Sequence, residues 1–427
     1  MMKDNIEVAV IGLGYVGLPL ANAFSKVYKV IGFDTNANKI NKYKLGIDIT
    51  NEIGNEKLKN STIFFTNNEN DIKNADVYII AVPTPIDLEQ QPYIKDTMNA
   101  TKLVGKMLKK GDLVIYESTF YPGMTEEKCI PLLEQISNMK QSKNFYVGYS
   151  PERINPGDKK HKLENITKIV SGIDEDSKEY VYELYRKILI NEPYKVSSIK
   201  IAEASKILEN TQRDVNIAFM NEMSKFLKNC GINTQEVIEA CSTKWNFINF
   251  KPGLVGGHCI GIDPYYLIYK AETIGMNLKL IKESRNVNEE MKKYILDLLL
   301  KKINDATNKK EKSIIIYGVT FKENVSDIRN SKIIEIAKSL EEENNIKIYI
   351  SDTHVDLADI NKEYNTNFLS IDKCTEKVQG IVIGTPHNEY KNMTEDFLIA
   401  KLENIECPIL DINNIIKKNK NSKVWKL

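Results

Sequence analysis

A cysteine in a glycine-rich loop is the residue of this sequence that most clearly suggests chemistry. Cys259 lies in KPGLVGGHCIGIDPYYL (251–267), four residues before Asp263 and directly after His258. The surrounding glycines give a ligand close access to the backbone, and the adjacent histidine favours a reactive thiolate over a packing cysteine. A thiolate captures an aldehyde as a thiohemiacetal, which gives up a hydride and becomes a thioester that water hydrolyses to an acid.

A polar stripe on a predicted helix forms a second candidate group. Lys206 and Asn210 are four residues apart, and Glu203 and Arg213 extend the stripe by three residues on either side. Residues at these spacings share one helix face. One interpretation of the stripe is a solvated helix face. The other is a functional group of side chains in which a cation and a hydrogen-bond donor stabilise an alkoxide during oxidation. The full apolar face of the same helix favours the second interpretation.

A glycine pattern near the N-terminus predicts a dinucleotide site. The sequence GLGYVG (12–17) follows an apolar run at 6–11 and precedes a helical pattern; its glycines are Gly12, Gly14 and Gly17. They permit a tight turn and a close approach of the backbone to a pyrophosphate, whose charge meets N–H groups at the helix N-terminus. Asp34, about 20 residues on, would bind a ribose diol and repel a 2′-phosphate, which favours NAD over NADP. A glycine turn that binds nothing is the alternative.

Two predicted strand ends carry hydroxyl groups. VPTP (82–85) contains Thr84 and ESTFYPG (117–123) contains Thr119, and each segment follows an apolar run. Ligands of open α/β sheets lie beyond the carboxyl ends of the strands, so both threonines are candidates for ligand contact. Turn chemistry around proline is the alternative interpretation.

An α/β framework is predicted to position these residues. Apolar runs alternate with helix-compatible stretches in the N-terminal half, which predicts a parallel doubly wound sheet; the runs lie at 6–11, 28–34, 77–83, 112–118, 146–151 and 168–172. A second α/β domain is predicted from runs at 313–318, 346–351, 380–384 and 408–412. Between the two, a helix of roughly 45 Å runs from Ile199 to a stop at Gly231. We expect the Lys/Asn-rich tail after Ile415 to be frayed.

Composition excludes several classes of protein. The chain has 427 residues, 42% of them hydrophobic and 27% charged, so it is neither disordered nor fibrous and should form two or three domains. A net charge of +1 provides no general attraction for nucleic acid or an anionic membrane. The N-terminus does not resemble a signal peptide, and no run reaches about 18 apolar residues, so we expect a soluble, cytoplasmic protein.

The cysteines and histidines indicate neither disulfides nor a metal site. No C-x-x-C pair occurs, so the six cysteines are expected to be reduced. Those other than Cys259 are expected to be packing residues: Cys129, Cys230, Cys241, Cys374 and Cys407. His161, His354 and His387 show no ligand spacing, so surface or core roles are expected for them.

The motifs as a set resemble a known family. GLGYVG, VPTP, EST-x-x-PG, YSPER, E-x-x-K-x-x-x-N, GGHC-x-x-x-D and TFKENVSDIR occur in order over nearly the whole chain. Together they are similar to the UDP-glucose/GDP-mannose dehydrogenase family. The resemblance implies an α/β fold with two Rossmann-like doubly wound domains joined by a long central helix. It divides the chain into an NAD-binding domain (1–197), a central helical dimerisation domain with the cysteine loop (198–298), and a UDP-sugar-binding domain (299–427).

The same resemblance implies an activity and partners. The family oxidises the 6-hydroxyl of a nucleotide sugar to a carboxylate and reduces two NAD per turnover. The implied partners are the UDP-sugar substrate and a second copy of the chain, in a homodimer or a higher homo-oligomer, with no nucleic acid or membrane.

Residue roles follow from the matched motifs. Cys259 would be the nucleophile, Lys206 and Asn210 would stabilise the oxyanion, Asp263 would transfer protons with Lys206 through water, and Glu152 would direct the hydrolytic water. Thr119 would help to hold that water and the cofactor. The implied cofactor contacts are Gly12, Gly14, Tyr15, Val16, Gly17, Asp34, Lys39, Thr84, Thr119 and Arg329. The implied substrate contacts are Glu152, Arg153, Ile154, Lys206, Asn210, Arg213, Gly256, Phe321 and Lys322.

Departures from the UDP-glucose branch narrow the expected substrate. That branch usually reads GGSC-F-x-K-D, whereas this chain has His258 before the thiol, Ile262 before Asp263, and RINPG (153–157) after YSPE. The sequence is more similar to the bacterial branch acting on UDP-GlcNAc or UDP-GalNAc for surface polysaccharide precursors. Arg153 could donate to the acetamido carbonyl. UDP-N-acetylmannosamine and UDP-glucose are alternative substrates, and a single-step hydroxyacid dehydrogenase or a non-catalytic nucleotide-sugar binding protein are alternative functions.

Overall fold

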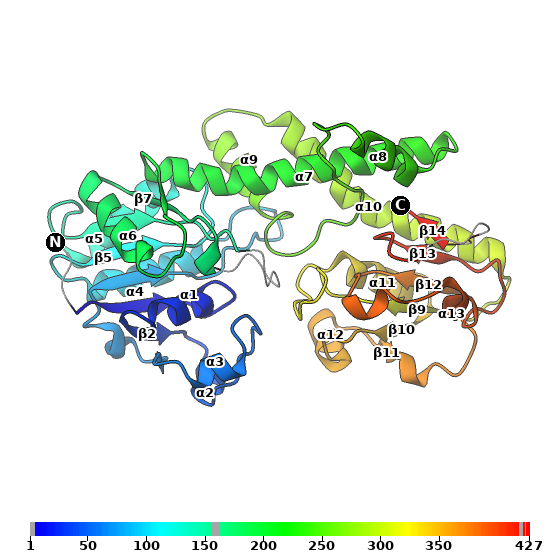
Figure 1. The fold of residues 1–427 in the computed structure, drawn as a ribbon, viewed down its shortest axis with the longest axis horizontal. Coiled ribbons are helices and arrows are strands. Elements are labelled where there is room, and N and C mark those ends of the chain that lie inside the picture. Colours follow the sequence, from blue (N-terminus) through cyan, green and yellow to red (C-terminus); the bar gives the residue numbers. More distant parts are fainter. Residues whose placement is uncertain (1–4, 155–162, 418–421, 423) are drawn as a thin grey trace. The chain divides into compact units, whose positions relative to one another are not determined.

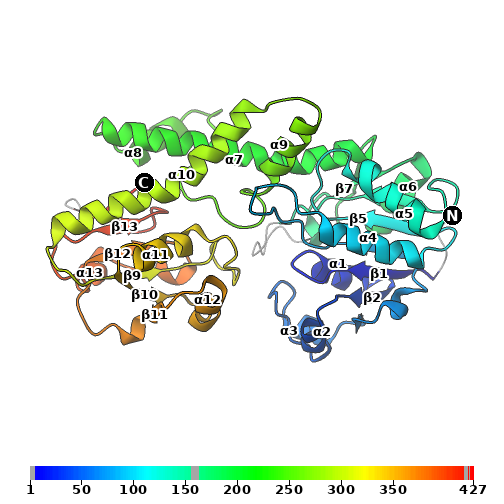
Figure 2. The same cartoon turned by 180° about the vertical axis from the view of Figure 1, so that it is seen from behind.

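Two compact units make up the protein in this computed structural model. It describes residues 5–154, 163–417, 422 and 424–427. The first unit comprises Met1–Asn210 with Tyr265–Asn277, and the second comprises Thr211–Pro264 with Leu278–Leu427. Figures 1 and 2 show the elements of both units from opposite sides.

The first unit contains an eight-stranded sheet in the order β3-β2-β1-β4-β5-β6-β7-β8. Its strands are β1 (Glu7–Ile11), β2 (Lys29–Phe33), β3 (Phe64–Thr66), β4 (Val77–Ile80), β5 (Leu113–Tyr116), β6 (Tyr146–Tyr149), β7 (Ile169–Gly172) and β8 (Tyr194–Lys195). β1, β4 and β5 are almost entirely buried, as expected for parallel strands covered on both faces. The apolar runs of the N-terminal half are thereby confirmed as strands.

One strand pair differs from the predicted all-parallel sheet. β6 and β7 are antiparallel. Among the described residues, the connection between them carries only the short helix η3 (Leu163–Asn165). Parallel pairing usually uses a crossover connection, whereas antiparallel strands need none, so the direction of β7 depends on this connection.

Helices α1–α6 belong to the first unit: α1 (Gly17–Phe24), α2 (Ala37–Lys44), α3 (Asn55–Lys59), α4 (Lys95–Met107), α5 (Ile130–Ser137) and α6 (Glu175–Arg186). Shorter helical turns are η1 (Glu69–Ile72) and η2 (Thr125–Cys129). Local capping explains where two of these helices begin. Asn36 accepts a hydrogen bond from the backbone of Lys39 at the start of α2, and Asp174 does the same for Ser177 at α6.

The predicted long helix is confirmed as α7 (Ile199–Asn229), which continues from the first unit into the second. Gly231 follows it with a φ of +72°, a left-handed conformation that stops helices. α8 (Thr234–Ser242), α9 (Asp263–Thr273) and α10 (Lys279–Ala306) follow along the chain.

The second unit contains a six-stranded, fully parallel sheet in the order β11-β10-β9-β12-β13-β14. Its strands are β9 (Lys312–Tyr317), β10 (Ile346–Ser351), β11 (Leu369–Ser370), β12 (Gly380–Ile383), β13 (Ile409–Asp411) and β14 (Val424–Lys426). Its further helices are α11 (Lys332–Glu342), α12 (Leu357–Tyr364) and α13 (Glu395–Ile399), with the turns η4 (Ile371–Lys373) and η5 (Asn388–Tyr390). Both sheets therefore have Rossmann-like strand order, and the expected fold class is confirmed.

The expectation of a frayed C-terminal tail is wrong for its last residues. β14 pairs in parallel with β13, and Val424 is buried. The ammonium of Lys228 lies 4.0 Å from the centre of the Trp425 ring. A short apolar segment that packs onto the sheet therefore outweighs the polar composition of the residues before it.

Candidate active site

A glycine turn follows β1 in the first unit. Gly12 has a φ of +91°, and its backbone N–H donates to Phe33 O at 2.9 Å. A Cβ atom added to Gly12 would lie 2.9 Å from the carbonyl oxygen of Ala81, and one added to Gly17 would lie 1.8 Å from the oxygen of Gly12. These two positions therefore require glycine so that α1 can begin directly against the turn.

Gly14 differs from its two neighbours in the motif because a Cβ atom there would meet nothing within 4 Å. Tyr15 and Val16 are partly buried beside it, and Val16 packs against the core. The open space thus lies next to the N-terminal end of α1, where a helix favours an anion.

Asp34 is fixed at the carboxyl end of β2. Its Oδ2 accepts hydrogen bonds from the backbone of Leu13 at 3.0 Å and from Lys39 Nζ at 2.8 Å, and its Oδ1 accepts one from the backbone of Asn36 at 2.9 Å. A carboxylate offers about four acceptor positions, so one remains for a ribose hydroxyl. The turn, the open space at Gly14 and the fixed carboxylate together fit NAD.

The two hydroxyl-bearing loops are joined at the ends of β4 and β5. Ser118 Oγ donates to Val82 O at 2.6 Å, and Tyr266 OH donates to Pro85 O at 3.0 Å. Thr84 and Thr119 are both partly exposed. The structure thus places VPTP and EST at one edge of the sheet, as the strand-end argument requires.

Glu152 lies just beyond β6 and is more than nine-tenths buried. Its Oε1 accepts hydrogen bonds from the backbone N–H groups of Arg153 and Ile154, whereas Oε2 is buried with no partner in the described parts of the chain. An unsatisfied buried carboxylate oxygen is an acceptor that a water or a substrate can fill.

The side chain of Arg153 is bound by two other groups of the protein. Its guanidinium pairs with Glu209 Oε1 at 2.7 Å and donates to Thr167 O at 2.9 Å. Ile154 is partly buried against the core. The segment 155–157 of the RINPG motif, and His161, lie outside the described residues.

Sequence reasoning did not identify a buried ion pair below this loop. Lys168 Nζ lies 2.6 Å from Glu117 Oε2, both side chains are fully buried, and Lys168 also donates to Pro151 O at 3.1 Å. Tyr185 OH donates to the same carboxylate. Burial raises the pKa of Glu117 to about 7, and the charge of Lys168 opposes that shift. In the sequence the two residues appear only as single charges, Glu117 near the end of one apolar run and Lys168 at the start of another.

The polar stripe on α7 is not a solvated face in the first unit. Glu203 is fully buried and accepts hydrogen bonds from Gly123 N at 2.5 Å and from Thr125 Oγ1 at 2.7 Å. Burial raises its pKa to about 7. Lys206 and Asn210 are each only 8% exposed. The alternative of a solvated stripe is therefore wrong for these three residues.

The cysteine loop belongs to the second unit. Cys259 is exposed, and its carbonyl oxygen accepts hydrogen bonds from Ile262 N at 3.1 Å and Asp263 N at 2.9 Å. Asp263 is buried at the start of α9. These bonds form a tight turn that presents the thiol at the surface of its unit.

His258 does not support the thiolate in the expected way. Burial, reinforced by the charge of Arg329, lowers the pKa of His258 to about 4. The imidazole is therefore neutral near pH 7 and supplies no positive charge to Cys259. The prediction that the adjacent histidine favours a thiolate is therefore wrong for this loop, and the access given by its glycines remains the feature that favours a reactive Cys259.

Contacts on the N-terminal side of the thiol fix the loop. The Asn221 amide accepts from Gly253 N at 2.8 Å and donates to Gly253 O at 3.0 Å. A Cβ atom on Gly256 would lie 2.7 Å from Asn330 O, and one on Gly257 would lie 2.5 Å from the Phe321 ring. The cysteine loop is thus packed closely against the segment after β9.

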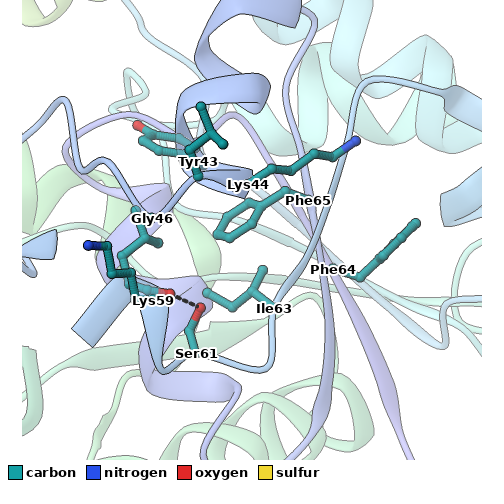
Figure 3. A pocket seen from close by; sticks show the side chains of 10 residues that line it. Tyr43, Lys44, Gly46, Lys59, Ser61, Ile63, Phe64 and Phe65 are labelled. Carbon is teal, nitrogen blue, oxygen red and sulfur yellow. Dashed lines mark hydrogen bonds between the residues drawn. The ribbon is translucent and has the colours of Figure 1, made fainter. Parts of the chain in front are cut away.

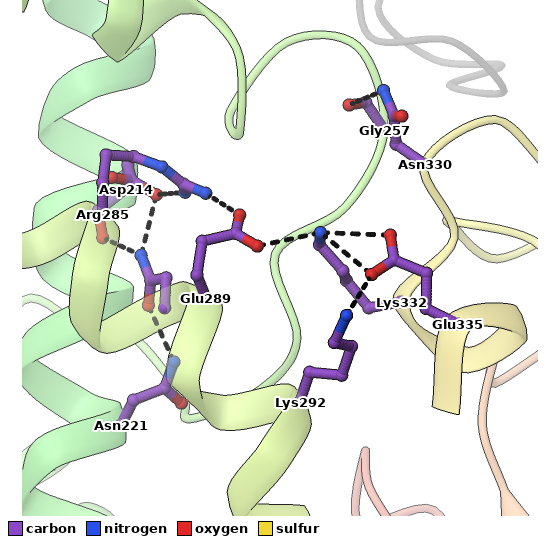
Figure 4. Close-up of polar contacts among 10 residues, drawn as sticks. Asp214, Asn221, Gly257, Arg285, Glu289, Lys292, Asn330, Lys332 and Glu335 are labelled. Carbon is purple, nitrogen blue, oxygen red and sulfur yellow. Dashed lines mark hydrogen bonds and ion pairs between the residues drawn. The ribbon is translucent and has the colours of Figure 1, made fainter. Parts of the chain in front are cut away.

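A polar network behind the loop joins α7, α10 and α11, as Figure 4 shows. Asn221 donates to Asn288 at 2.8 Å, Asn288 donates to Asp214 at 2.7 Å, and Arg285 pairs with Asp214 at 2.6 Å. All four side chains are buried. A buried network of this kind fixes the position of the helices that carry it.

A pocket of about 400 Å³ lies at the carboxyl ends of β9 and β12. It is lined in part by Gly256, Phe321 and Thr385 and by the lysines Lys251, Lys322, Lys332 and Lys391. Lys332 pairs with Glu289 at 3.0 Å and Glu335 at 3.1 Å. The position is the switch point of the sheet, where open α/β sheets bind ligands, and the lysines suit an anionic ligand.

Another pocket, of about 440 Å³, lies in the first unit and is shown in Figure 3. Tyr43 and Lys44 from α2 and Phe64 and Phe65 from β3 contribute to its lining. Tyr43 OH donates to Leu13 O at 2.8 Å, which ties this region to the glycine turn. The pocket has none of the predicted site residues in its lining.

The predicted site residues divide between the two units. The first unit holds the glycine motif, Asp34, Lys39, Thr84, Thr119, Glu152, Arg153, Ile154, Lys206 and Asn210. The second holds Arg213, Gly256, Cys259, Asp263, Phe321, Lys322 and Arg329. Arg213 is exposed, and Arg329 pairs with Asp327 at 2.6 Å.

The remaining cysteines fit the packing expectation only in part. None of the six, all of which lie in the described ranges, forms a disulfide, and Cys129 and Cys407 are buried. Cys230 and Cys241 are exposed and Cys374 is partly exposed, so the expectation is wrong for these three. Cys241 lies on the solvent face of α8, whereas Cys230 and Cys374 come directly after the ends of α7 and η4. Within the part of the chain that the structure describes, no group of three or more His, Cys, Asp or Glu side chains is arranged to hold a metal ion.

A search of the described helices finds none that is long and apolar enough to cross a membrane.

Three domains of one family match the chain. Residues 6–189 match the NAD binding domain of the UDP-glucose/GDP-mannose dehydrogenase family, residues 200–290 its central domain, and residues 315–418 its UDP binding domain.

Individual relatives match over nearly their whole length. Protein CapL of Staphylococcus aureus is 44% identical over 99% of this chain and 100% of its own. A UDP-N-acetyl-D-glucosamine 6-dehydrogenase of Pseudomonas aeruginosa is 44% identical over 98% and 99%. The solved structure of a UDP-D-ManNAc dehydrogenase from Pyrococcus horikoshii has a TM-score of 0.86 at 30% identity and covers 99% of both chains.

Proposed function

The chain belongs to the UDP-glucose/GDP-mannose dehydrogenase family, and we propose that it oxidises the 6-hydroxyl of a UDP-N-acetylhexosamine to the uronic acid. The observation that carries the proposal is the loop of Cys259, which is exposed and packs against the segment lining the lysine-rich pocket. A thiol beside a nucleotide-sugar pocket suits an oxidation that proceeds past the aldehyde. The proposed product serves as a precursor of surface polysaccharide, made in the cytoplasm.

The glycine turn and Asp34 would hold NAD, with Gly14 leaving room for the pyrophosphate and Lys39 beside the carboxylate. Thr84, Thr119 and Arg329 are proposed as further contacts. When bound, NAD supplies the hydride acceptor for both oxidations.

Cys259 is proposed as the nucleophile. After the alcohol has lost a proton and a hydride, the thiolate adds to the aldehyde carbon to give a thiohemiacetal. Loss of a second hydride leaves a thioester, and water cleaves its C–S bond to release the acid and the thiol. In total, one alcohol, two NAD⁺ and one water give one carboxylate, two NADH and three protons.

The remaining side chains are proposed to handle charge and protons. Lys206 and Asn210 stabilise the oxyanion, and Asp263 moves protons with Lys206 through water. Glu152 directs the hydrolytic water, with Thr119 helping to hold it. The buried Oε2 of Glu152, which has no protein partner in the described ranges, supports this role.

The substrate is proposed to bind the pocket beside β9 and β12. Lys322 and Phe321 line it together with Gly256. Arg153, Ile154 and Arg213 are proposed as further contacts, although the guanidinium of Arg153 is already paired with Glu209. The division at 197/198 and 298/299 and assembly through the central helical domain into a homodimer or a higher homo-oligomer are parts of the same proposal.

The relative from Pseudomonas aeruginosa, at 44% identity, favours UDP-GlcNAc, with UDP-GalNAc as its epimer. The structural neighbour from Pyrococcus horikoshii, at 30% identity, supports UDP-ManNAc as the second candidate. UDP-glucose is the remaining alternative. It ranks below the acetylated sugars because it lacks the acetamido group that RINPG is proposed to accommodate.

A panel of sugars tests the proposal. NADH formation is followed by absorbance with UDP-GlcNAc, UDP-GalNAc, UDP-ManNAc, UDP-glucose and GDP-mannose, each offered separately. We expect the highest kcat/KM with UDP-GlcNAc or UDP-GalNAc, at least tenfold above UDP-glucose, since an acetamido group that fits its site contributes more than about 1.4 kcal/mol. A preference for UDP-glucose would refute the choice of substrate, and no turnover with any sugar would favour a binding protein.

A further inference from the structure

We propose that His387 is a positioning residue that holds the turn of Lys322 at the pocket of the second unit, through the hydrogen bond that its Nδ1 accepts from the backbone of Asn324. The proposal rests on the proposed function, because it concerns the pocket assigned there to the UDP-sugar.

His387 is fully buried just after β12. Its Nδ1 accepts a hydrogen bond from the backbone N–H of Asn324 at 2.9 Å. Its Nε2 lies 3.2 Å from Asp352 Oδ2 and 3.2 Å from Thr320 Oγ1. Because a backbone N–H can only donate, the network assigns the proton of the neutral ring to Nε2.

These bonds fix the turn formed by residues 320–324. Thr320 Oγ1 donates to Lys322 O at 2.7 Å, and Asn388 N donates to Asn324 Oδ1 at 3.0 Å. Asn324 has a φ of +59°, a left-handed conformation that surrounding contacts must maintain. Since the bond from Asn324 to His387 anchors one end of the turn, its loss would let the backbone of Lys322 move away from the pocket.

The carboxylate of Asp352 orients the ring of His387. Its Oδ2 accepts the hydrogen bond from Nε2–H, so that Nδ1 faces the N–H of Asn324 as an acceptor. Burial raises the pKa of Asp352, but hydrogen bonds from His387 and from the backbone of Val319 bring it below its ordinary value. The ionised carboxylate is therefore the second contact that fixes the imidazole.

The other charged and titratable groups near His387 come from several elements. From the segment after β10, the His354 ring lies 4.4 Å from the His387 ring, centre to centre. From η5, Glu389 lies 3.4 Å from His354 Nε2, and the Tyr390 ring lies 5.6 Å from His387. On the turn itself, Glu323 pairs with Lys391 at 3.4 Å. His354 is thus the matched neighbouring histidine, and it is not bonded to the turn.

Two substitutions separate the two nitrogens. In His387→Asn, the amide oxygen lies near the place of Nδ1 and can still accept from Asn324. In His387→Gln, the longer side chain reaches the place of Nε2 and leaves the N–H of Asn324 unpaired. Loss of one buried hydrogen bond corresponds to about a 5- to 10-fold change in an equilibrium constant.

The experiment is calorimetric titration of the full chain with UDP-GlcNAc at pH 8. We expect His387→Gln to weaken binding about 5- to 10-fold and His387→Asn, which keeps the acceptor for Asn324, to stay within about 2-fold of wild type. The control, His354→Asn, should keep the wild-type affinity.

The outcomes separate this proposal from the proposed function. If the wild type binds no UDP-sugar, the proposed function fails, and this inference fails with it. If the wild type binds but His387→Gln binds equally well, only this inference is overturned. Equal weakening by His387→Asn and His387→Gln would also overturn it, because the role would then be packing and not the bond to Asn324.

Discussion

The glycine turns of the two units share one backbone framework. After β1, Gly12 N donates to Phe33 O at 2.9 Å and Leu13 N donates to the carboxylate of Asp34 at 3.0 Å. After β9, Gly318 N donates to Ser351 O at 2.9 Å and Val319 N donates to the carboxylate of Asp352 at 2.7 Å. In each unit, a glycine with positive φ and an aspartate at the end of the next strand close the same turn.

The segments after these turns differ between the units. In the first, α1 begins at Gly17, so backbone N–H groups at a helix N-terminus adjoin the open space. In the second, the next helix begins only at Lys332, and the intervening loop brings Phe321 and Lys322 to a pocket. One backbone framework can therefore meet an anion either with backbone dipoles or with lysine side chains.

The partner of the aspartate differs as well. Asp34 pairs with Lys39, whose side chain is partly exposed. Asp352 pairs with the fully buried His387, which also accepts a hydrogen bond from the backbone of Asn324. The aspartate of the second turn is thereby linked through one buried side chain to the loop that carries Lys322.

Alanine at a glycine that packs against each turn, Gly17 in the first unit and Gly384 in the second, is predicted to have the largest effect. In Gly17→Ala the new Cβ would lie 1.8 Å from Gly12 O, and in Gly384→Ala it would lie 2.5 Å from Gly318 O. Overpacking of about 3 kcal/mol lowers affinity by about 100-fold. Calorimetry should show that Gly17→Ala loses NAD binding while UDP-GlcNAc binding stays within about 2-fold, and Gly384→Ala the reverse. Equal loss of both ligands in both variants would break the comparison.

Asp352→Asn is predicted to destabilise the second unit by about 2 kcal/mol at pH 7, because hydrogen bonds to a buried charge are lost. The pKa of Asp352 is below its ordinary value, so its contribution is present above about pH 4 and is lost as pH falls further. Both tryptophans, Trp245 and Trp425, belong to the second unit, so urea unfolding followed by their fluorescence reports it. A difference from wild type that grows below pH 4 would contradict this.

Gly14→Ala tests whether the open space of the first turn holds a ligand. A Cβ atom there meets nothing within 4 Å, so the free energy of unfolding should change by less than about 0.5 kcal/mol. If the pyrophosphate approaches this backbone, NAD affinity should still fall about 10-fold. Thermal unfolding and NAD titration measure the two quantities, and unchanged NAD affinity would place the ligand elsewhere.

Lys39→Ala is predicted to have the smallest effect. Its side chain is 24% exposed, and partly exposed ion pairs contribute about 0.2–1 kcal/mol. NAD affinity should therefore fall only about 2- to 4-fold, with UDP-GlcNAc affinity unchanged. A loss above about 20-fold would mean that Lys39, and not Asp34 with the turn, dominates this end of the site.

The sequence predicted the parts of the fold that depend on local patterns. Apolar runs located the central strands of both sheets, and helical periodicity with a glycine stop located α7. The antiparallel β7 and the strand β14 were not predicted, because pairing at a sheet edge depends on partners distant in the chain.

The site was predictable where a motif is contiguous. GLGYVG with Asp34, and the glycines around Cys259, could be read from adjacent residues. The pair Glu117–Lys168 joins residues 51 positions apart, and the bond from Asn324 to His387 joins residues 63 apart. Single charged or imidazole side chains next to strands give no local signal of such pairing. His258 was expected to support a thiolate at Cys259, but burial and the charge of Arg329, which is distant in sequence, lower its pKa and keep it neutral.

The ratio of NADH formed to uronic acid released tests the central claim most directly. With the preferred UDP-sugar, absorbance and chromatography of the same reaction should give two NADH per acid in the wild type. Cys259→Ser should still bind the sugar but form no acid, because a weak nucleophile cannot replace the thiolate. A ratio of one NADH per sugar, with an aldehyde or ketone as the final product, would contradict the role of Cys259.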